Sequence, residues 1–207
     1  MVDAEFNRRN TLLAFNAGLW ESQFVRFNSM GSELERFPCR LSVAETDGEI
    51  VASLTNLKSE AINCMHFQDL PDEMDVMKGG HWSLGPLQLQ PASHWGAEFC
   101  ICDRDQRRRV VIKYSPSGFD SCVLIWDQSA PNQPIVSSSP MQFQCLSVSG
   151  ASSGHRLWQC GEELEILVME EPGNGKPGVT GLRWRPRPET TLECMRNYDS
   201  EGRFNHQ

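Results

Sequence analysis

Apolar residues recur at alternate positions along most of the chain, which is the pattern of half-buried β-strands. Between residues 19 and 27 the period is two, so that one face carries Trp20, Ser22, Phe24 and Arg26. The runs 35–45 and 49–57 alternate in the same way on either side of Asp47-Gly48, a dipeptide typical of two-residue hairpin turns. These runs predict a β-hairpin.

Further strand-like runs follow at short spacing. Three of them, at 95–103, 107–115 and 120–128, are separated by short turn sequences and predict a meander. The others cover 61–69, 81–90, 141–149, 155–171 and 179–187. About ten short strands in succession are typical of an all-β sandwich or an up-and-down barrel.

The first residues differ from the rest of the chain. Residues 3–16 place Phe6, Leu12, Leu13 and Phe15 among polar neighbours, with Asp3 as a candidate N-cap, and predict a short helix. We therefore expect an all-β fold: an antiparallel up-and-down barrel, lipocalin-like, over about 18–186, preceded by this helix. A polar C-terminal tail, 187–207, completes a single domain over 1–207. A division near the 129–140 loop is the alternative.

Net charge indicates which partners to expect, and cysteine content indicates the cellular compartment. The chain has 207 residues and a formal net charge of -8, which disfavours binding to nucleic acid because phosphate backbones require clustered Lys and Arg. The one basic run, Arg107-Arg108-Arg109, is interpreted as a turn and strand start with a solvated face, and a patch that binds nucleic acid or an anionic ligand is the alternative. Eight cysteines without a secretory signal, and no apolar stretch long enough for a membrane span, predict a cytoplasmic protein with reduced thiols.

A glycine and a tryptophan stand where the predicted helix meets the first strand. Gly18 tolerates positive φ and so allows a sharp turn, and Trp20 is large enough to close the end of a barrel while its indole N–H reaches a main-chain carbonyl. A cation on the last strand is expected to stack on the indole. Arg183 and Arg185, on one face of the last run, are the candidates.

The candidate ligand-binding residues follow from the same alternation. Glu98, Cys100 and Cys102 share one face of their strand, and Ala97, Phe99 and Ile101 share the other. If Glu98 faces a cavity, a cation must pair with it, and Arg26 is the candidate. Trp82 and Trp126 are candidates for an aromatic pocket wall. No zinc spacing occurs among the cysteines and histidines, so no metal site is predicted, and no catalytic residue is assigned.

The helix, Gly-x-Trp, barrel and closing arginine together resemble the lipocalin and fatty-acid-binding superfamily, the calycins. Residues 79–114 look like part of an uncharacterised lipocalin-like family of cyanobacteria and other phototrophs. The similar pieces are Gly80, Ser83, Gly85, Leu87 and Gln88, then residues 96–98, then residues 108–109. The motif Gly-x-Trp-x-Ser, formed here by Gly18, Trp20 and Ser22, also resembles a motif of phycobiliprotein chromophore lyases. The Arg-x-x-x-His-His run that usually follows in those lyases is replaced here by the sequence QFVRFN.

This resemblance implies a ligand class. The expected function is binding of a small, mostly apolar molecule in the barrel: a bilin or other tetrapyrrole, a carotenoid-derived molecule or a fatty acid. One alternative is an enzyme, a bilin lyase or isomerase that presents the chromophore to a cysteine of a phycobiliprotein subunit. The other is an interaction module with a filled barrel.

Overall fold

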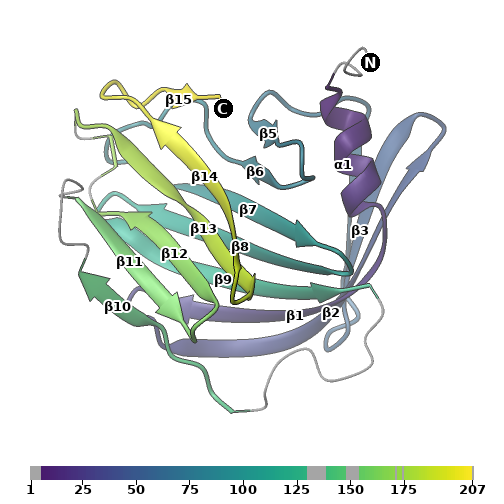
Figure 1. Ribbon diagram of the computed structural model, residues 1–207, viewed down its shortest axis with the longest axis horizontal. Coiled ribbons are helices and arrows are strands. Elements are labelled where there is room, and N and C mark those ends of the chain that lie inside the picture. Colours follow the sequence, from purple (N-terminus) through teal and green to yellow (C-terminus); the bar gives the residue numbers. More distant parts are fainter. Residues whose placement is uncertain (1–5, 130–138, 148–153, 171, 174, 207) are drawn as a thin grey trace.

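The computed structural model describes residues 6–129, 139–147, 154–170, 172–173 and 175–206. Within these residues the chain forms one helix and two antiparallel sheets (Figure 1). The elements are α1 (Arg8–Asn16), β1 (Gly18–Asn28), β2 (Glu33–Thr46), β3 (Glu49–Asn56), β4 (Ile62–Phe67), β5 (Met74–Val76), β6 (Trp82–Leu84), β7 (Trp95–Asp103), β8 (Gln106–Ser115), β9 (Gly118–Gln128), β10 (Gln144–Ser147), β11 (His155–Cys160), β12 (Leu164–Met169), β13 (Gly178–Arg187), β14 (Thr190–Tyr198) and β15 (Phe204–Asn205).

Helix α1 is shorter than the sequence pattern predicts. It begins at Arg8 because the side chain of Asn7 accepts the main-chain N–H of Asn10 at 2.9 Å, which caps the first turn. The expected cap, Asp3, lies outside the described residues. Among the described residues, no helix combines the length and the apolar character needed to cross a membrane.

The first sheet has nine strands in the order β4-β3-β2-β1-β9-β8-β7-β6-β5. The predicted hairpin is confirmed, since β2 and β3 pair and Asp47 and Gly48 both adopt positive φ, 52° and 81°. The predicted meander of β7, β8 and β9 is confirmed as well. The sheet curls into a half-barrel, and its two edge strands, β4 and β5, do not pair with each other.

The remaining strands form a second sheet of six, in the order β10-β11-β12-β13-β14-β15. The expectation of one closed barrel is therefore wrong, because the strands after residue 140 pair among themselves and not with β1–β9. The expectation that residues 187–207 form a tail outside the strands is also wrong, since Thr190–Tyr198 form β14 and Phe204–Asn205 form β15.

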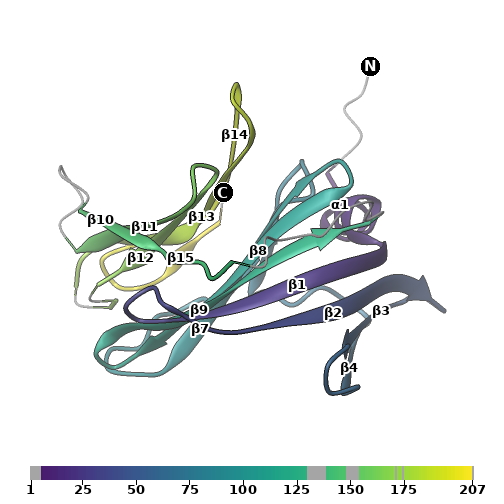
Figure 2. The same ribbon diagram turned by 90° about the horizontal axis from the view of Figure 1, so that it is seen from below.

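The main core lies between the two sheets. Figure 2 shows the six-stranded sheet stacked on one face of the nine-stranded sheet, whose β2–β3–β4 end bends away from it. Phe99 and Ile101 of β7 and Leu182 and Trp184 of β13 belong to this core, and each is at most 1% exposed. We call the face of the nine-stranded sheet that packs against the second sheet the outer face. The opposite face, which carries Trp20, Ser22 and Phe24, is the inner face.

Candidate functional site

Trp20 and an arginine stack at the C-terminal end of α1, on the inner face. Gly18 has φ of +129°, as the sharp turn from helix to strand requires. Trp20 is 4% exposed and its indole Nε1–H donates to the carbonyl of Asn16 at 3.1 Å, as predicted. The guanidinium carbon of Arg107 lies 3.8 Å from the centre of the indole ring, within the range of a cation–π interaction.

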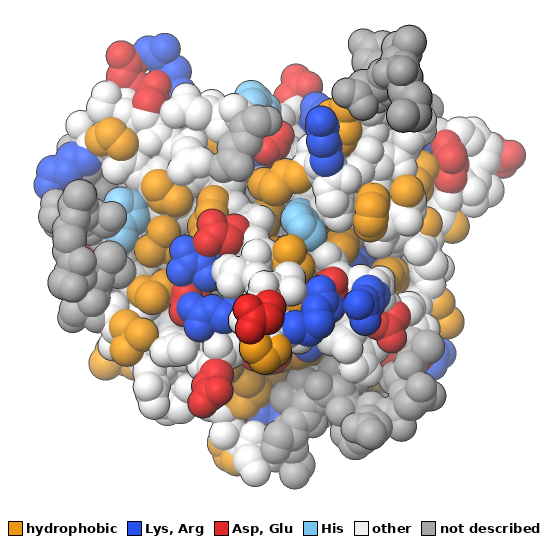
Figure 3. Space-filling model, in the orientation of Figure 1, with side chains coloured by type: hydrophobic (Ala, Val, Ile, Leu, Met, Phe, Trp, Pro, Cys, Tyr) orange, Lys and Arg blue, Asp and Glu red, His pale blue; other side chains and the backbone are white. Residues whose placement is uncertain are grey.

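The two arginines expected over Trp20 lie elsewhere. Arg183 and Arg185 are on β13 of the second sheet, where both pair with Glu165, at 2.7 and 2.9 Å. The expectation that Arg183 or Arg185 stacks on Trp20 is wrong, because β13, which carries both arginines, belongs to the other sheet. On the face shown in Figure 3, basic and acidic side chains lie beside one another in a mixed band where the β13–β14 hairpin passes.

The basic run of β8 is buried, which corrects its interpretation as a solvated face. Arg107, Arg108 and Arg109 are 1%, 7% and 7% exposed. Because side chains alternate along a strand, Arg107 and Arg109 lie on the inner face and Arg108 on the outer face. There the guanidinium carbon of Arg108 lies 4.5 Å from the centre of the Trp184 ring, between the two sheets.

Asp127 holds the two inner arginines together. Strand pairing places Ser22 opposite Asp127, and Asp127 opposite Arg107. The carboxylate of Asp127, 0% exposed, accepts hydrogen bonds from Nε and Nη2 of Arg109 at 2.7 and 3.2 Å and from the hydroxyl of Ser22. Nη2 of Arg107 lies 3.3 Å from the same carboxylate.

The charges of this network set its protonation. Burial by itself would raise the pKa of Asp127, but the guanidinium groups of Arg109 and Arg107 outweigh it and hold that pKa below its ordinary value of 3.8. Burial by itself would lower the pKa of Arg109, but Asp127 and Glu98 outweigh this effect and raise that pKa above its ordinary value, so that the guanidinium stays charged. Two cations and two carboxylates therefore make the inner network neutral overall.

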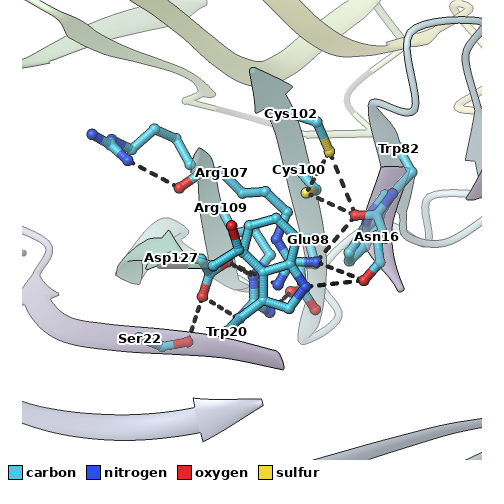
Figure 4. A network of polar contacts seen from close by, with 12 residues as sticks. Asn16, Trp20, Ser22, Trp82, Glu98, Cys100, Cys102, Arg107, Arg109 and Asp127 are labelled. Carbon is cyan, nitrogen blue, oxygen red and sulfur yellow. Dashed lines mark hydrogen bonds and ion pairs between the residues drawn. The ribbon is translucent and has the colours of Figure 1, made fainter. Parts of the chain in front are cut away.

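Asn16 links the network to the helix. Its buried Oδ1 accepts from Nε1 of Trp82 at 3.1 Å and from Nη1 of Arg107 at 3.2 Å, and its Nδ2 donates to the carbonyl of Gly80 at 3.0 Å. Figure 4 shows Asn16 between Trp82 on one side and the arginines and Trp20 on the other. The side-chain amide thus fixes the end of α1 to β6 and β8.

A pocket of about 140 Å³ opens beside this network. Four polar residues of the network line its one polar end, namely Asn16, Glu98, Arg107 and Arg109. The rest of its wall is apolar and consists of Leu12, Leu41, Val43, Ile50, Ala52, Leu54, Met65, Phe67, Leu70, Pro71, Met74, Trp82 and Leu84. Apolar walls with a few converging polar groups are typical of small-molecule sites.

The four ligand-binding candidates separate in the structure. Trp82 and Glu98 line the pocket, and Glu98 pairs with Nη1 of Arg109 at 2.9 Å. Arg26 does not pair with Glu98, since its side chain is 47% exposed and lies 3.1 Å from Glu35. Trp126 faces the other way, 4% exposed in the core between the sheets.

Four functional candidates were missed from the sequence: Asn16, Arg107, Arg109 and Asp127. A signal for three of them exists. Glu98 and Asp127 each interrupt an apolar run, in the strands on either side of the basic run of β8. Acids inside buried strands require cations, and the intervening strand supplies them. Within the described residues, no group of three or more His, Cys, Asp or Glu side chains is arranged to hold a metal ion.

Comparison with known proteins gives a family and a fold. Residues 7–130 match the family model of the N-terminal part of a domain of unknown function, DUF3598. A crystal structure of a DUF3598-family protein of unknown function from Nostoc punctiforme PCC 73102 is similar, with a TM-score of 0.73 and 16% identity over 96% of each chain. No curated protein matches at a significant level. At this identity the structural likeness extends to the fold alone.

Proposed function

This chain belongs to the DUF3598 family, and we propose that it binds a small, mostly apolar molecule in the pocket on the inner face of its nine-stranded sheet. The observation that carries the proposal is the division of the pocket wall into a continuous apolar part and a single polar end. Such a division fixes the direction in which an amphipathic ligand enters.

The size of the pocket favours the smaller of the expected ligands. Its volume of about 140 Å³ is comparable to that of an engineered cavity in another protein, about 150 Å³, which binds benzene. One ring of a carotenoid-derived molecule or a short acyl chain fits this space. A whole bilin, with four rings, requires the half-barrel to open further between β4 and the β5–β6 edge. The same argument weighs against transfer of a whole bilin to a phycobiliprotein subunit, and the open pocket weighs against a filled interaction module.

Arg107 supports a ligand that accepts hydrogen bonds. This side chain is 1% exposed, yet its Nε has no hydrogen-bond partner and its Nη2 has only the long ion pair with Asp127. A buried donor without a partner destabilises the empty site, so a ligand oxygen placed there gains more than it would in water. We therefore expect a carbonyl or carboxylate oxygen at the polar end.

The balance of charges in the site favours a carbonyl head group over a carboxylate. Arg107 and Arg109 are balanced by Asp127 and Glu98, so a carbonyl leaves the site neutral, while a carboxylate adds an uncompensated charge. We expect a ketone or aldehyde to bind more tightly than the carboxylic acid of equal chain length. This order differs from that of a site built around a free arginine.

The test is a calorimetric titration with 2-octanone, octanoic acid and octane at pH 7. The expected order is ketone first, and Ala52→Phe, which fills the apolar part of the pocket, should weaken ketone binding at least about tenfold. Val51→Phe is the matched control, because Val51 is the neighbouring residue on the opposite face of β3 and should leave binding unchanged. Equal ketone binding by the wild type and both variants, or no binding of any of the three ligands, would contradict the proposal.

A further inference from the structure

Strand β4 is a free edge of the nine-stranded sheet. Within the described residues it pairs with β3 and has no partner on its other side. It runs over six residues, Ile62–Phe67, and the first five of them are exposed. The other strands at sheet ends, β5, β10 and β15, have three, four and two residues. Among the described strands, β4 is therefore the longest free edge.

This edge lacks the features that normally keep edge strands apart. Natural edge strands are protected by lysine, proline or a bulge. The sequence INCMHF contains neither lysine nor proline, and its register with β3 runs without a shift from Ile62 to Phe67. Ile62 is 66% exposed and Met65 is 41% exposed. The unprotected edge therefore also carries exposed apolar side chains.

The main-chain groups of three residues point out of this edge. The N–H of Asn56 donates to the carbonyl of Ala61 at 2.9 Å, so these two residues form a hydrogen-bonded pair. Because hydrogen bonding alternates along an antiparallel pair, the odd-numbered residues of β4 bond to β3. The N–H and C=O groups of Ile62, Cys64 and His66 therefore point away from β3.

We propose that two copies of this chain form a two-fold dimer in which their β4 strands pair antiparallel. Residues that exchange hydrogen bonds across such a pair must both point out of their edges. The register centred on Cys64 satisfies all three, since Cys64 lies opposite the partner's Cys64 and Ile62 opposite the partner's His66. Each of these pairs exchanges two main-chain hydrogen bonds, which gives about six in total. Any other register places at least one of the three opposite a residue outside the strand.

Charge and shape are compatible with a second copy at this edge. In the register centred on Cys64, Glu60 lies opposite the partner's Gln68 and Asp69 opposite the partner's Ser59, so like charges are not directly opposed. Figure 2 shows β4 at the end of the sheet that bends away from the second sheet, which leaves room for the partner. The two-fold symmetry gives both copies the same matched register and closes the assembly at two chains. An unrelated strand has no such match, which favours the second copy.

The dimer extends the apolar wall of the pocket. Met65 lines the pocket on the inner face of β4. The register places it diagonally beside the partner's Met65, within reach of a long side chain. This consequence rests on the proposed function, because it concerns a ligand chain that passes Met65, but the dimer itself does not depend on a ligand.

The test is sedimentation velocity of the whole chain from low to high micromolar concentration. We expect a reversible monomer–dimer equilibrium, because one short strand pair buries less surface than a permanent interface. Cys64→Lys places like charges opposite each other on the two-fold axis and should weaken dimerisation at least about tenfold. Ser42→Lys is the matched control, because Ser42 is exposed on the same face of the sheet but on β2, away from the edge. It should leave dimerisation unchanged.

Cross-linking with a short bismaleimide gives an independent result. Cys64 and Cys145 are both exposed. We expect Cys145→Ser, which keeps Cys64, to form covalent dimers, and Cys64→Ser, which keeps Cys145, to form few. A chain that stays monomeric at every concentration, equal dimerisation of Cys64→Lys and Ser42→Lys, or equal cross-linking through the two cysteines would overturn the proposal. Absence of ketone binding counts against the proposed function alone, since sedimentation and cross-linking use no ligand.

Discussion

Replacing Asp127 by asparagine removes the charge that holds Arg107 and Arg109 together in the interior. The carboxylate is 0% exposed and is contacted by both guanidinium groups and by the hydroxyl of Ser22. Asparagine is nearly isosteric and keeps one acceptor oxygen. Its amide nitrogen, however, presents N–H groups to guanidinium N–H groups, so at least one of the arginine contacts becomes repulsive.

The expected loss follows from the number of charges left unpaired. Removing one partner of a buried ion pair costs about 3–5 kcal/mol, because the other charge stays buried. Since Glu98 still compensates Arg109 and asparagine keeps one acceptor, we expect the lower end, about 3 kcal/mol in the free energy of unfolding. For a chain of 150–250 residues this corresponds to a fall in Tm of about 6–12 °C.

The pH dependence gives an independent check. Because the pKa of Asp127 is lower in the folded protein than its ordinary value of 3.8, the unfolded chain binds this proton more readily. The stability that Asp127 contributes is therefore complete above about pH 4 and is lost as pH falls through the folded pKa. The asparagine variant should lack this part of the acid dependence, so that its stability approaches that of the wild type at low pH.

The assay is urea unfolding at pH 7 and across the acid range, followed by tryptophan fluorescence. Asp120→Asn is the matched control, since Asp120 lies on the same strand but is exposed and should change stability by less than about 0.5 kcal/mol. If Asp127→Asn differs from this control by less than about 1 kcal/mol, the buried charges do not stabilise the fold as argued.

Four further substitutions test other parts of the structure by the same unfolding assay, and the last of them also by ligand titration. Gly118→Ala should cost about 2–4 kcal/mol, because φ is +107° and a Cβ would lie 2.4 Å from the carbonyl oxygen of Glu170. Gly161→Ala, with φ of +63° and open space around it, should cost only about 1 kcal/mol, and equal losses would contradict the steric argument. Arg196→Met should cost at least about 3 kcal/mol, since the fully buried guanidinium donates to three main-chain carbonyls, and a neutral result would refute this. Arg26→Ala should change neither stability nor 2-octanone affinity, and weakened binding would return Arg26 to the site.

Features set by sequence neighbours could be predicted. The turn at Asp47-Gly48, the meander of β7–β9, and the Gly18 turn with the Trp20 indole bond each depend on a few consecutive residues. The alternation of Glu98 with Phe99 also held, because a strand reverses its side chains at every residue. Such local rules fix which strands are adjacent in a hairpin, and they leave the partners of the outermost strands open.

Pairings between distant segments could not be predicted. Whether β1–β9 close into a barrel depends on whether the edge strands β4 and β5 pair with each other. No turn sequence specifies that pairing. The change of sheet after β9 is carried by a connection that includes residues 130–138, which lie outside the described residues. The burial of Arg107–Arg109 depends on Asp127 in the next strand and on Trp20 and Trp184, so charge alone gave the wrong environment for this run.

The arrangement of the two faces also restricts how a ligand can lie. The outer face is packed against the second sheet mainly over apolar residues, with Arg108 buried among them. The paired buried charges of Arg107, Arg109 and Asp127 lie on the inner face, near the end of α1. There, the charged groups of the pocket lie on β7 and β8, and the apolar wall is formed by β2, β3 and β4 on one side and by α1, β5 and β6 on the other. For the ligand that we propose, we expect the oxygen to lie toward Arg107 and the chain toward β4. Since β4 is an edge strand, we expect a longer chain to extend outward past Met65, and affinity to rise with chain length until the chain reaches water.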